Sequence, residues 1–247
     1  MSNSKLVTYE RISPNRTSPR NHKIDTITIH CYVGQVTAKA GCDNSRFTKK
    51  NPISGASCNY VVGCDGSIGL CVPEADRSWC SSNRANDHRA VTIEVACETT
   101  HPYKVTDAAM SALIDLVADI CSRNGIKQLL WQGDKSLIGQ VDKQNMTVHR
   151  WFANKACPGD YLYGKHDYIA TEVNKRLGAT AQETTATAYK VRVTATALKV
   201  RAGAGTSYKA TRSVKKGQVY TIVAEQNGWG KLKSGAGWIC LSYTEKV

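Results

Sequence analysis

Apolar and polar side chains alternate along two stretches of this chain, as they do in β-strands whose two faces meet different surroundings. In Lys23–Cys31 the odd positions from Ile27 onwards are apolar, whereas His30 falls among the polar residues of the opposite face. In Val91–Cys97 the apolar residues again share one face, and Glu94 lies on the other. If both strands belong to one sheet, His30 and Glu94 emerge on the same side of it.

The spacing of apolar residues changes to that of a helix in residues 106–124. Thr106 is a good N-cap, and Gly125 is a typical residue to end a helix. A second helix is predicted from about His166 to Leu177. The buried stripe of the first helix is expected to hold Met110, Leu113, Ile114, Val117, Ile120 and Cys121.

Two more predicted strands, residues 59–64 and 67–72, flank Asp65-Gly66, which is a strong hairpin signal. Strands and helices therefore mix throughout residues 23–178. This order predicts an α/β domain with a mixed central sheet flanked by helices.

The pattern changes after residue 178. Residues 179–188 are small and polar, so they are typical of a linker. Short β-branched runs between Gly-rich turns follow and predict a small all-β barrel or sandwich. We therefore expect a domain of residues 1–178, a linker of residues 179–188 and a second domain of residues 189–247. The predicted strands of that second domain are Lys190–Val193, Leu198–Arg201, Val219–Glu225, Gly230–Lys233 and Gly237–Leu241.

Composition limits the class of protein. With 247 residues, 41% of them hydrophobic, the chain can bury a substantial core. No apolar run approaches the roughly 20 residues of a membrane span, so membrane insertion is not expected. The first residues contain no apolar segment of the kind found in secretory signals, which predicts synthesis in the cytoplasm.

The ten cysteines do not form a recognisable zinc or redox motif, because no two are spaced C-x-x-C. In the cytoplasm most of them are expected to be reduced thiols that pack as small apolar side chains. A disulfide within the cysteine-rich region remains open, but the sequence does not pair its members, which are Cys42, Cys58, Cys64, Cys71 and Cys80.

The positive charge of the chain is concentrated at one end. The net charge is +13, and residues 189–247 hold eleven Lys or Arg against two acids. Such a domain is expected to meet an acidic partner, such as nucleic acid, an anionic polymer or a membrane surface. A basic face that serves only solubility is an equally common alternative.

Candidate chemistry centres on the stretch from Thr147 to Asp160, which holds His149, Lys155 and Cys157. A lone His is usually a surface or core residue, and a lone Cys is usually a small buried hydrophobe. Here Val148 and His149 are predicted to end a short strand, and the polar loop after them can fold back so that His149 and Cys157 meet.

With His30 these two residues make a set of three zinc ligands, which is typical of a catalytic site with one open position. Zinc lowers the pKa of bound water and polarises a carbonyl group. Glu94 could accept the proton of the water, and Lys155 could stabilise the oxyanion. These residue types suggest a zinc hydrolase of amides or esters and leave its substrate open.

Four motifs, in this order along the chain, resemble the N-acetylmuramoyl-L-alanine amidase family 2, which includes phage lysins and animal peptidoglycan recognition proteins. The resemblance covers about residues 23–178 and is most specific around Lys155. It implies zinc ligands at His30, His149 and Cys157, with Glu94 and Lys155 as catalytic groups. The motifs are Ile27–His30, Asn59–Val62 with Asp65-Gly66-Ser67, Val91–Glu94, and His149 with Lys155–Gly159.

Two positions depart from the pattern of this family. Some members carry a catalytic Tyr where this chain has Cys58, so more weight falls on Glu94. Many members carry His where this chain has Asn59.

The C-terminal part resembles a bacterial SH3-like cell-wall-binding domain, which would hold the enzyme on the wall. The aromatic residues of this part could bind a ligand or belong to its core, and for Trp238 we favour the core. The resemblance rests on Leu198–Gly203, Tyr208, Lys216-Gly217, Asn227–Lys231 and Gly237–Ile239.

The two resemblances together imply an enzyme that cleaves the amide between N-acetylmuramic acid and L-alanine in peptidoglycan. They suggest a phage or prophage endolysin, made in the cytoplasm and acting on the wall after release. One alternative is a peptidoglycan receptor on the same fold without catalysis. Another is a nucleic-acid-binding protein, but the chain has neither a basic and aromatic platform nor a zinc-finger spacing, so no nucleic-acid partner is expected.

Overall fold

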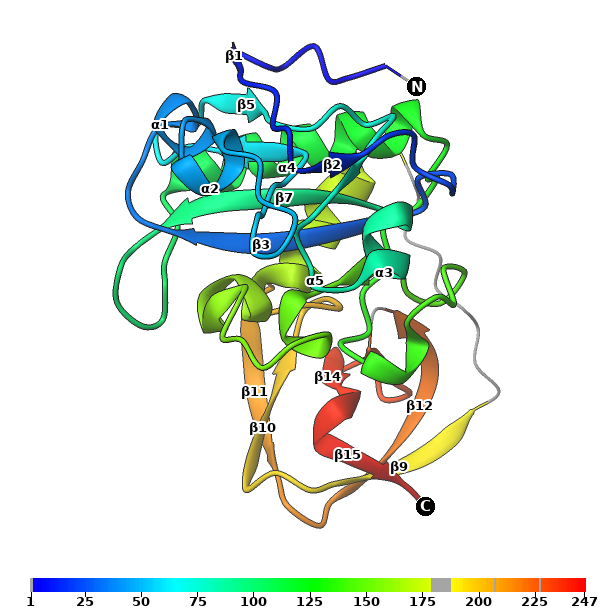
Figure 1. Ribbon diagram of the computed structural model, residues 1–247. Coiled ribbons are helices and arrows are strands. Elements are labelled where there is room, and N and C mark those ends of the chain that lie inside the picture. Colours follow the sequence, from blue (N-terminus) through cyan, green and yellow to red (C-terminus); the bar gives the residue numbers. More distant parts are fainter. Residues whose placement is uncertain (1, 179–187, 207, 227) are drawn as a thin grey trace.

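The computed structural model describes residues 2–178, 188–206, 208–226 and 228–247 (Figure 1). The N-terminal part is built on a six-stranded sheet with the strand order β1-β5-β4-β7-β3-β8. Only β4 and β5 pair antiparallel in this sheet, so the expected mixed sheet is confirmed. Its strands are β1 (Tyr9–Glu10), β3 (Thr26–Val33), β4 (Tyr60–Val62), β5 (Ile68–Leu70), β7 (Ala90–Cys97) and β8 (Met146–Thr147), and β2 (Arg16–Thr17) pairs separately with β6 (Arg77–Ser78).

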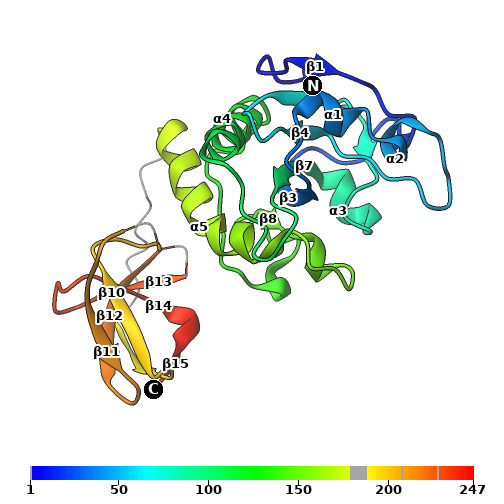
Figure 2. The ribbon, with the colours of Figure 1, turned by 90° about the vertical axis from the view of Figure 1, so that its left-hand side faces the viewer.

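Helices cover both faces of this sheet (Figure 2). The long helices α4 and α5 lie on the face where Ile29 of β3 and Ile93 of β7 are part of the main apolar core. The short helices lie on the other face, to which the alternation of side chains assigns His30 and Glu94. The helices are α1 (Ala38–Cys42), α2 (Ser45–Thr48), α3 (Arg84–Arg89), α4 (Asp107–Arg123) and α5 (Gly159–Arg176).

The first predicted helix is confirmed as α4. The side chain of Thr106 caps it by accepting a hydrogen bond from the backbone N–H of Ala109, and Asn124 is its C-cap. The start predicted for the second helix, His166, is wrong because α5 already begins at Gly159. Its first turns carry polar and aromatic residues with no apolar stripe, so the apolar spacing could not reveal them.

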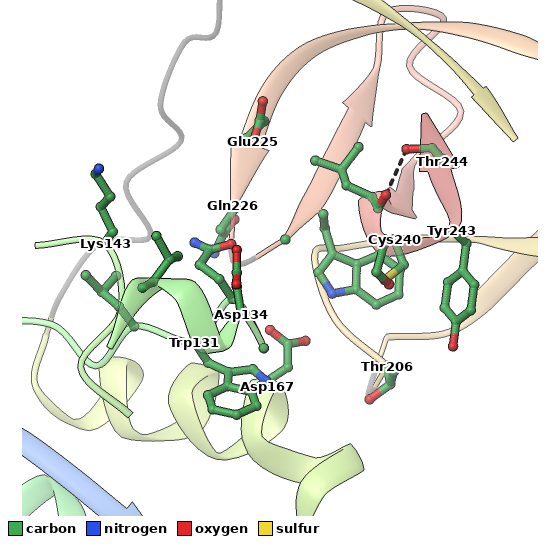
Figure 3. Close-up of a pocket in the computed structure, with 18 of the residues that line it drawn as sticks. Trp131, Asp134, Lys143, Asp167, Thr206, Glu225, Gln226, Cys240, Tyr243 and Thr244 are labelled. Atoms are coloured by element: carbon green, nitrogen blue, oxygen red, sulfur yellow. Dashed lines mark hydrogen bonds between the residues drawn. The ribbon is translucent and has the colours of Figure 1, made fainter. Parts of the chain in front are cut away.

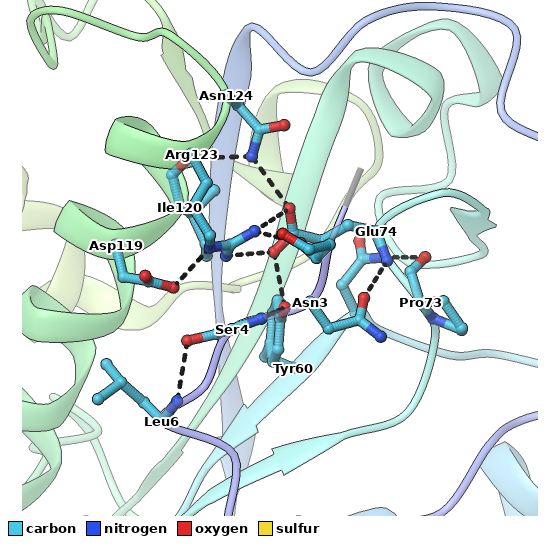
Figure 4. Close-up of polar contacts among 12 residues, drawn as sticks. Asn3, Ser4, Leu6, Tyr60, Pro73, Glu74, Asp119, Ile120, Arg123 and Asn124 are labelled. Carbon is cyan, nitrogen blue, oxygen red and sulfur yellow. Dashed lines mark hydrogen bonds and ion pairs between the residues drawn. The ribbon is translucent and has the colours of Figure 1, made fainter.

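The N-terminal arm, residues 2–22, is held by a buried ion pair (Figure 4). The Glu74 carboxylate is fully buried, and the guanidinium of Arg123 contacts both of its oxygens at 2.6 and 3.0 Å. The Tyr60 hydroxyl donates to one oxygen at 2.6 Å, and the Asn124 amide donates to the other at 3.0 Å. The backbone N–H of Ser4 donates to the Tyr60 hydroxyl, so the network ties the arm to β4 and α4.

Replacing Glu74 by alanine is expected to lower the free energy of unfolding by about 3–5 kcal/mol, because it leaves the half-buried Arg123 without its main partner. Urea unfolding measures this loss. Asp115→Ala is the matched control, since Asp115 pairs with Arg176 at 2.7 Å on the exposed side of α4. Such a surface pair contributes about 1 kcal/mol or less. Equal losses in the two variants would contradict this account of the arm.

The C-terminal part is a separate, fully antiparallel seven-stranded sheet, which confirms the small all-β fold. It has its own apolar core. Trp238, only 6% exposed, is buried as expected, in a second apolar cluster with Trp229. Its strand order is β11-β10-β14-β13-β12-β9-β15. The strands are β9 (Tyr189–Val193), β10 (Ala197–Arg201), β11 (Ala210–Lys215), β12 (Val219–Gln226), β13 (Trp229–Leu232), β14 (Trp238–Cys240) and β15 (Thr244–Lys246).

Two of these strands, β11 and β15, were not predicted. They form the two ends of the sheet order, and most of their residues are exposed. An exposed edge strand lacks the apolar alternation by which strands are found. The predicted linker, apart from Ala188, lies outside the described residues, so the boundaries at 178 and 189 stay a prediction. Among the described helices, none is both long and apolar enough to cross a bilayer.

A cavity of about 1070 Å³ lies where α5 and the residues after α4 meet the C-terminal sheet (Figure 3). Asp167 of α5 projects into it. Burial raises the pKa of Asp167 from 3.8 to about 7, although the Trp229 indole and the Thr206 backbone offset part of this rise.

Asp167 is expected to make stability depend on pH. Between pH 4 and 7, approximately, the folded protein holds a proton on Asp167 that the unfolded chain has lost, so stability falls as pH rises through this window. The Asp167→Asn variant lacks this ionisation. It is expected to match the wild type below about pH 4 and to be more stable by up to about 4 kcal/mol at about pH 8. Unfolding curves at several pH values measure this difference, and a difference that does not change with pH would contradict the assignment.

Candidate metal and active site

The polar residues of the two central strands lie side by side. Strands β3 and β7 pair in parallel, and the register places His30 directly opposite Glu94. This confirms that both emerge on one side of the sheet. His30 is nevertheless fully buried, because α3 and the segment before it cover this face.

The second histidine and the cysteine reach the same place from the other end of the domain. Strand β8 lies next to β3 and ends at Thr147, and His149 begins a short 3₁₀ turn, so the prediction that His149 ends a strand is wrong. The loop after it returns, with the backbone N–H of Arg150 donating to the carbonyl of Cys157 at 3.1 Å. The fold-back expected from the sequence is therefore present.

Three candidate ligand atoms converge. The Cys157 Sγ lies 3.4 Å from the His30 Nδ1, and the ring centroids of His30 and His149 are 5.0 Å apart. One ligand atom from each of the three residues lies within 4.8 Å of the other two. Nitrogen and sulfur ligands of one tetrahedral zinc ion are about 3.5 Å apart, so the separation of His30 and Cys157 fits a shared metal.

Hydroxyl groups orient both imidazoles. The Nε2 of His30 lies 3.2 Å from the Ser81 Oγ, and the Nε2 of His149 lies 3.1 Å from the Ser82 Oγ. The amide of Asn86 donates to Ser81 at 3.2 Å. Partners of this kind fix which ring nitrogen is available to a metal.

Asn86 connects this arrangement to the strands beneath it. Its amide also donates to the Thr28 hydroxyl at 3.0 Å, and its carbonyl accepts from the Thr147 hydroxyl at 2.9 Å. Sequence reasoning missed Ser81, Ser82 and Asn86. They lie in loops or a short helix with no periodic pattern, and no signal in the sequence could have singled them out.

Both imidazoles are neutral near pH 7, which is the form that binds a metal. Burial, followed by the neighbouring His149, lowers the pKa of His30 to about 3. Burial and the positive charge of Lys155 lower the pKa of His149. The hydrogen bond with Cys31, together with burial, raises the pKa of the Cys157 thiol, whereas a bound cation favours its thiolate.

Glu94 lies beside this cluster at the base of a groove of about 710 Å³. Its Oε2 has no hydrogen-bond partner among the described residues, and its Oε1 lies 3.9 Å from the Cys80 Sγ. Burial, followed by the charge of Cys31, raises the pKa of Glu94 to about 8. A carboxylate, a thiol and an imidazole nitrogen, from Glu94, Cys80 and His30, lie within 4.8 Å of one another.

Lys155 borders the same groove and is exposed, so its ammonium group is free to approach a bound substrate. Cys58, which the resemblance places at the position of a catalytic Tyr, is fully buried. It packs in a small cluster with Cys42 and Cys71 behind the groove.

Comparison with known families decides the class of the protein. Residues 20–160, more than half of the chain, match the family model described as N-acetylmuramoyl-L-alanine amidase. The chain belongs to this amidase family. The amidase also carries, at residues 196–244, a match to the bacterial SH3 domain. The family is typically zinc-dependent, and its substrate is peptidoglycan.

Several solved structures are similar to the amidase at low sequence identity. A mutant endolysin from Bacillus subtilis is 19% identical, with a TM-score of 0.47 over 68% of this chain and 99% of that one. The endolysin amidase LysCS from Clostridium intestinale URNW is 16% identical, with a TM-score of 0.43 over 70% and 98%. A derivative of AmpD is 17% identical, with a TM-score of 0.48 over 72% and 99%. No curated protein sequence matches the amidase.

Proposed function

We propose that this amidase holds a zinc ion with His30, His149 and Cys157 and hydrolyses the amide between N-acetylmuramic acid and L-alanine in peptidoglycan. The convergence of three ligand atoms within 4.8 Å carries the proposal. Two imidazoles and a thiol are a donor set that zinc prefers, and three protein ligands leave one position open. When bound, zinc supplies Lewis acidity for the carbonyl and lowers the pKa of water.

Glu94 is the proposed proton carrier. In its ionised form, which a bound cation favours, the free Oε2 accepts a proton from the attacking water, and the same carboxyl then returns the proton to the amide nitrogen as the carbon–nitrogen bond breaks. The products are a carboxylate on the muramic acid and a free amino group on L-alanine. Lys155, exposed at the rim, stabilises the negative charge that develops on the carbonyl oxygen.

The C-terminal part is the proposed wall-binding unit, with catalysis assigned to residues 1–178 and wall binding to residues 189–247 on either side of the linker 179–188. The excess of positive charge in residues 189–247 suits a wall that carries anionic groups. We infer that the enzyme acts as an endolysin, which is made in the cytoplasm and reaches the wall after release.

Digestion of purified sacculi, followed by mass analysis of the soluble products, tests this function. The expected products are stem peptides with a new L-alanine N-terminus and glycan strands that keep their length. New reducing sugar ends would identify a glycosidase instead. Binding to sacculi without release of any product would favour the alternative of a receptor without catalysis.

A further inference from the structure

Two buried cysteines on the groove side of the sheet face each other. Cys42 is the last residue of α1, and Cys71 directly follows β5, beside which α1 packs (Figure 1). Both are fully buried, and their Sγ atoms are 3.1 Å apart. A disulfide bond is about 2.05 Å long, so a shift of about 1 Å would allow the two sulfurs to bond.

Strand β5 has a glycine, Gly69, where the Cys42 sulfur packs against it. Gly69 of β5 lies directly beneath it, and a Cβ at this position would be 2.4 Å from the Cys42 Sγ. Helix α1 has only five residues, and so short a helix is not stable by itself. A covalent link to β5 would therefore stabilise a segment that has little stability of its own.

We propose that Cys42 and Cys71 are a disulfide-forming pair, which is reduced in the cytoplasm and oxidised once the enzyme is outside it. The exit from the cytoplasm rests on the proposed function, but the capacity to form this bond does not. The bond would fix α1 and, through it, the segment that follows. Asn44, Arg46 and Phe47 of that segment line the catalytic groove, so the disulfide would hold one wall of the site.

Cys58 is the competing partner. It is fully buried in the same cluster, and its thiol also lies near Cys71. The pairing of Cys42 with Cys71 is favoured because their sulfurs lie only 3.1 Å apart. The hydrogen bond to Cys71 and burial raise the pKa of the Cys42 thiol, so its reaction is slow while the fold is closed.

The chemistry is a thiol–disulfide exchange with a low-molecular-weight disulfide as the oxidant. The thiolate of one cysteine attacks this disulfide, forms a mixed disulfide and releases one small thiol. The second cysteine then attacks the sulfur of the first and releases the other small thiol. The protein loses two hydrogen atoms, and the oxidant is reduced to two thiols.

The test is incubation of the full-length, zinc-loaded enzyme with oxidised glutathione, followed by alkylation and peptide mapping without reduction. The expected product is a peptide pair that links Cys42 to Cys71. The two residues are 29 positions apart, and closing a loop of this length is expected to raise the Tm by roughly 5–12 °C. Dithiothreitol should reverse this rise.

Single variants distinguish the effect of the Cys42–Cys71 bond from that of the other cysteines. Cys42→Ala should lose the rise in Tm, whereas Cys121→Ala, which removes another fully buried cysteine, should keep it. If Cys42→Ala does not fold, the peptide map of the wild type still decides. A link between Cys58 and Cys71, or alkylation of Cys42 and Cys71 in every oxidised sample, would overturn the proposal. Activity on sacculi is measured separately, so failure of the disulfide is distinguishable from failure of the proposed function.

Discussion

Replacing Cys157 by alanine is expected to lower kcat/KM on peptidoglycan by at least about 10³-fold while the fold is retained. The sulfur lies 3.4 Å from the His30 Nδ1, so its loss removes one of only three proposed protein ligands. A metal ion contributes several kcal/mol of charge stabilisation in the transition state, and each 1.4 kcal/mol or so corresponds to a factor of ten in rate. Release of soluble stem peptides from sacculi, with zinc content measured on the same sample, is the assay.

Cys121→Ala is the matched control for this variant. Cys121 is fully buried, whereas Cys157 is partly buried, and Cys121 lies in α4 on the opposite side of the sheet. This control should keep both zinc and activity. A chelator should inactivate the wild type, and added zinc should restore it, whereas Cys157→Ala should stay inactive. Full activity of Cys157→Ala without zinc would show that the metal is not needed.

The Glu94→Gln variant is expected to lose about 10²–10⁴-fold in kcat while it keeps its zinc and a similar KM. Glutamine has the shape of glutamate but cannot accept a proton from water. Glu94 faces His30 across the two central strands, and its Oε2 has no partner within the described residues, so it is well placed for proton transfer. Steady-state kinetics on a soluble muramoyl peptide separates kcat from KM.

Glu98→Gln serves as the control for Glu94→Gln, because Glu98 is an exposed acid just beyond the same strand. It should leave kcat and KM unchanged. If Glu94→Gln also lost its zinc, Glu94 would be a ligand or a support for the ligands. If it lost nothing, another group would have to carry the proton.

The part of the site that lies on strands could be predicted from the sequence. Alternation along β3 and β7 is a local property, and it predicts that His30 and Glu94 share one face without any knowledge of the strand register. The regular apolar stripe and capping residue likewise defined α4. Where the chain repeats a simple period, the sequence is therefore sufficient to predict the element and the face on which each side chain lies.

The remainder of the site depends on contacts between distant segments. Ser81 and Asn86 orient His30 through tertiary contacts, and no spacing marks them. The early start of α5 and the edge strands of the C-terminal sheet were missed because their residues are largely polar or exposed. Cys42 and Cys71 become neighbours only because α1 packs on β5. The sequence alone therefore could not predict that these two cysteines pair.

Zinc K-edge X-ray absorption on the purified enzyme tests the central claim most directly. The account predicts about one zinc per chain, bound by two nitrogen ligands at about 2.0–2.1 Å, one sulfur ligand at about 2.3 Å and one light atom from solvent. In Cys157→Ala the sulfur contribution should disappear. Zinc without a sulfur ligand in the wild type, or with four sulfur ligands, would contradict the assignment of His30, His149 and Cys157.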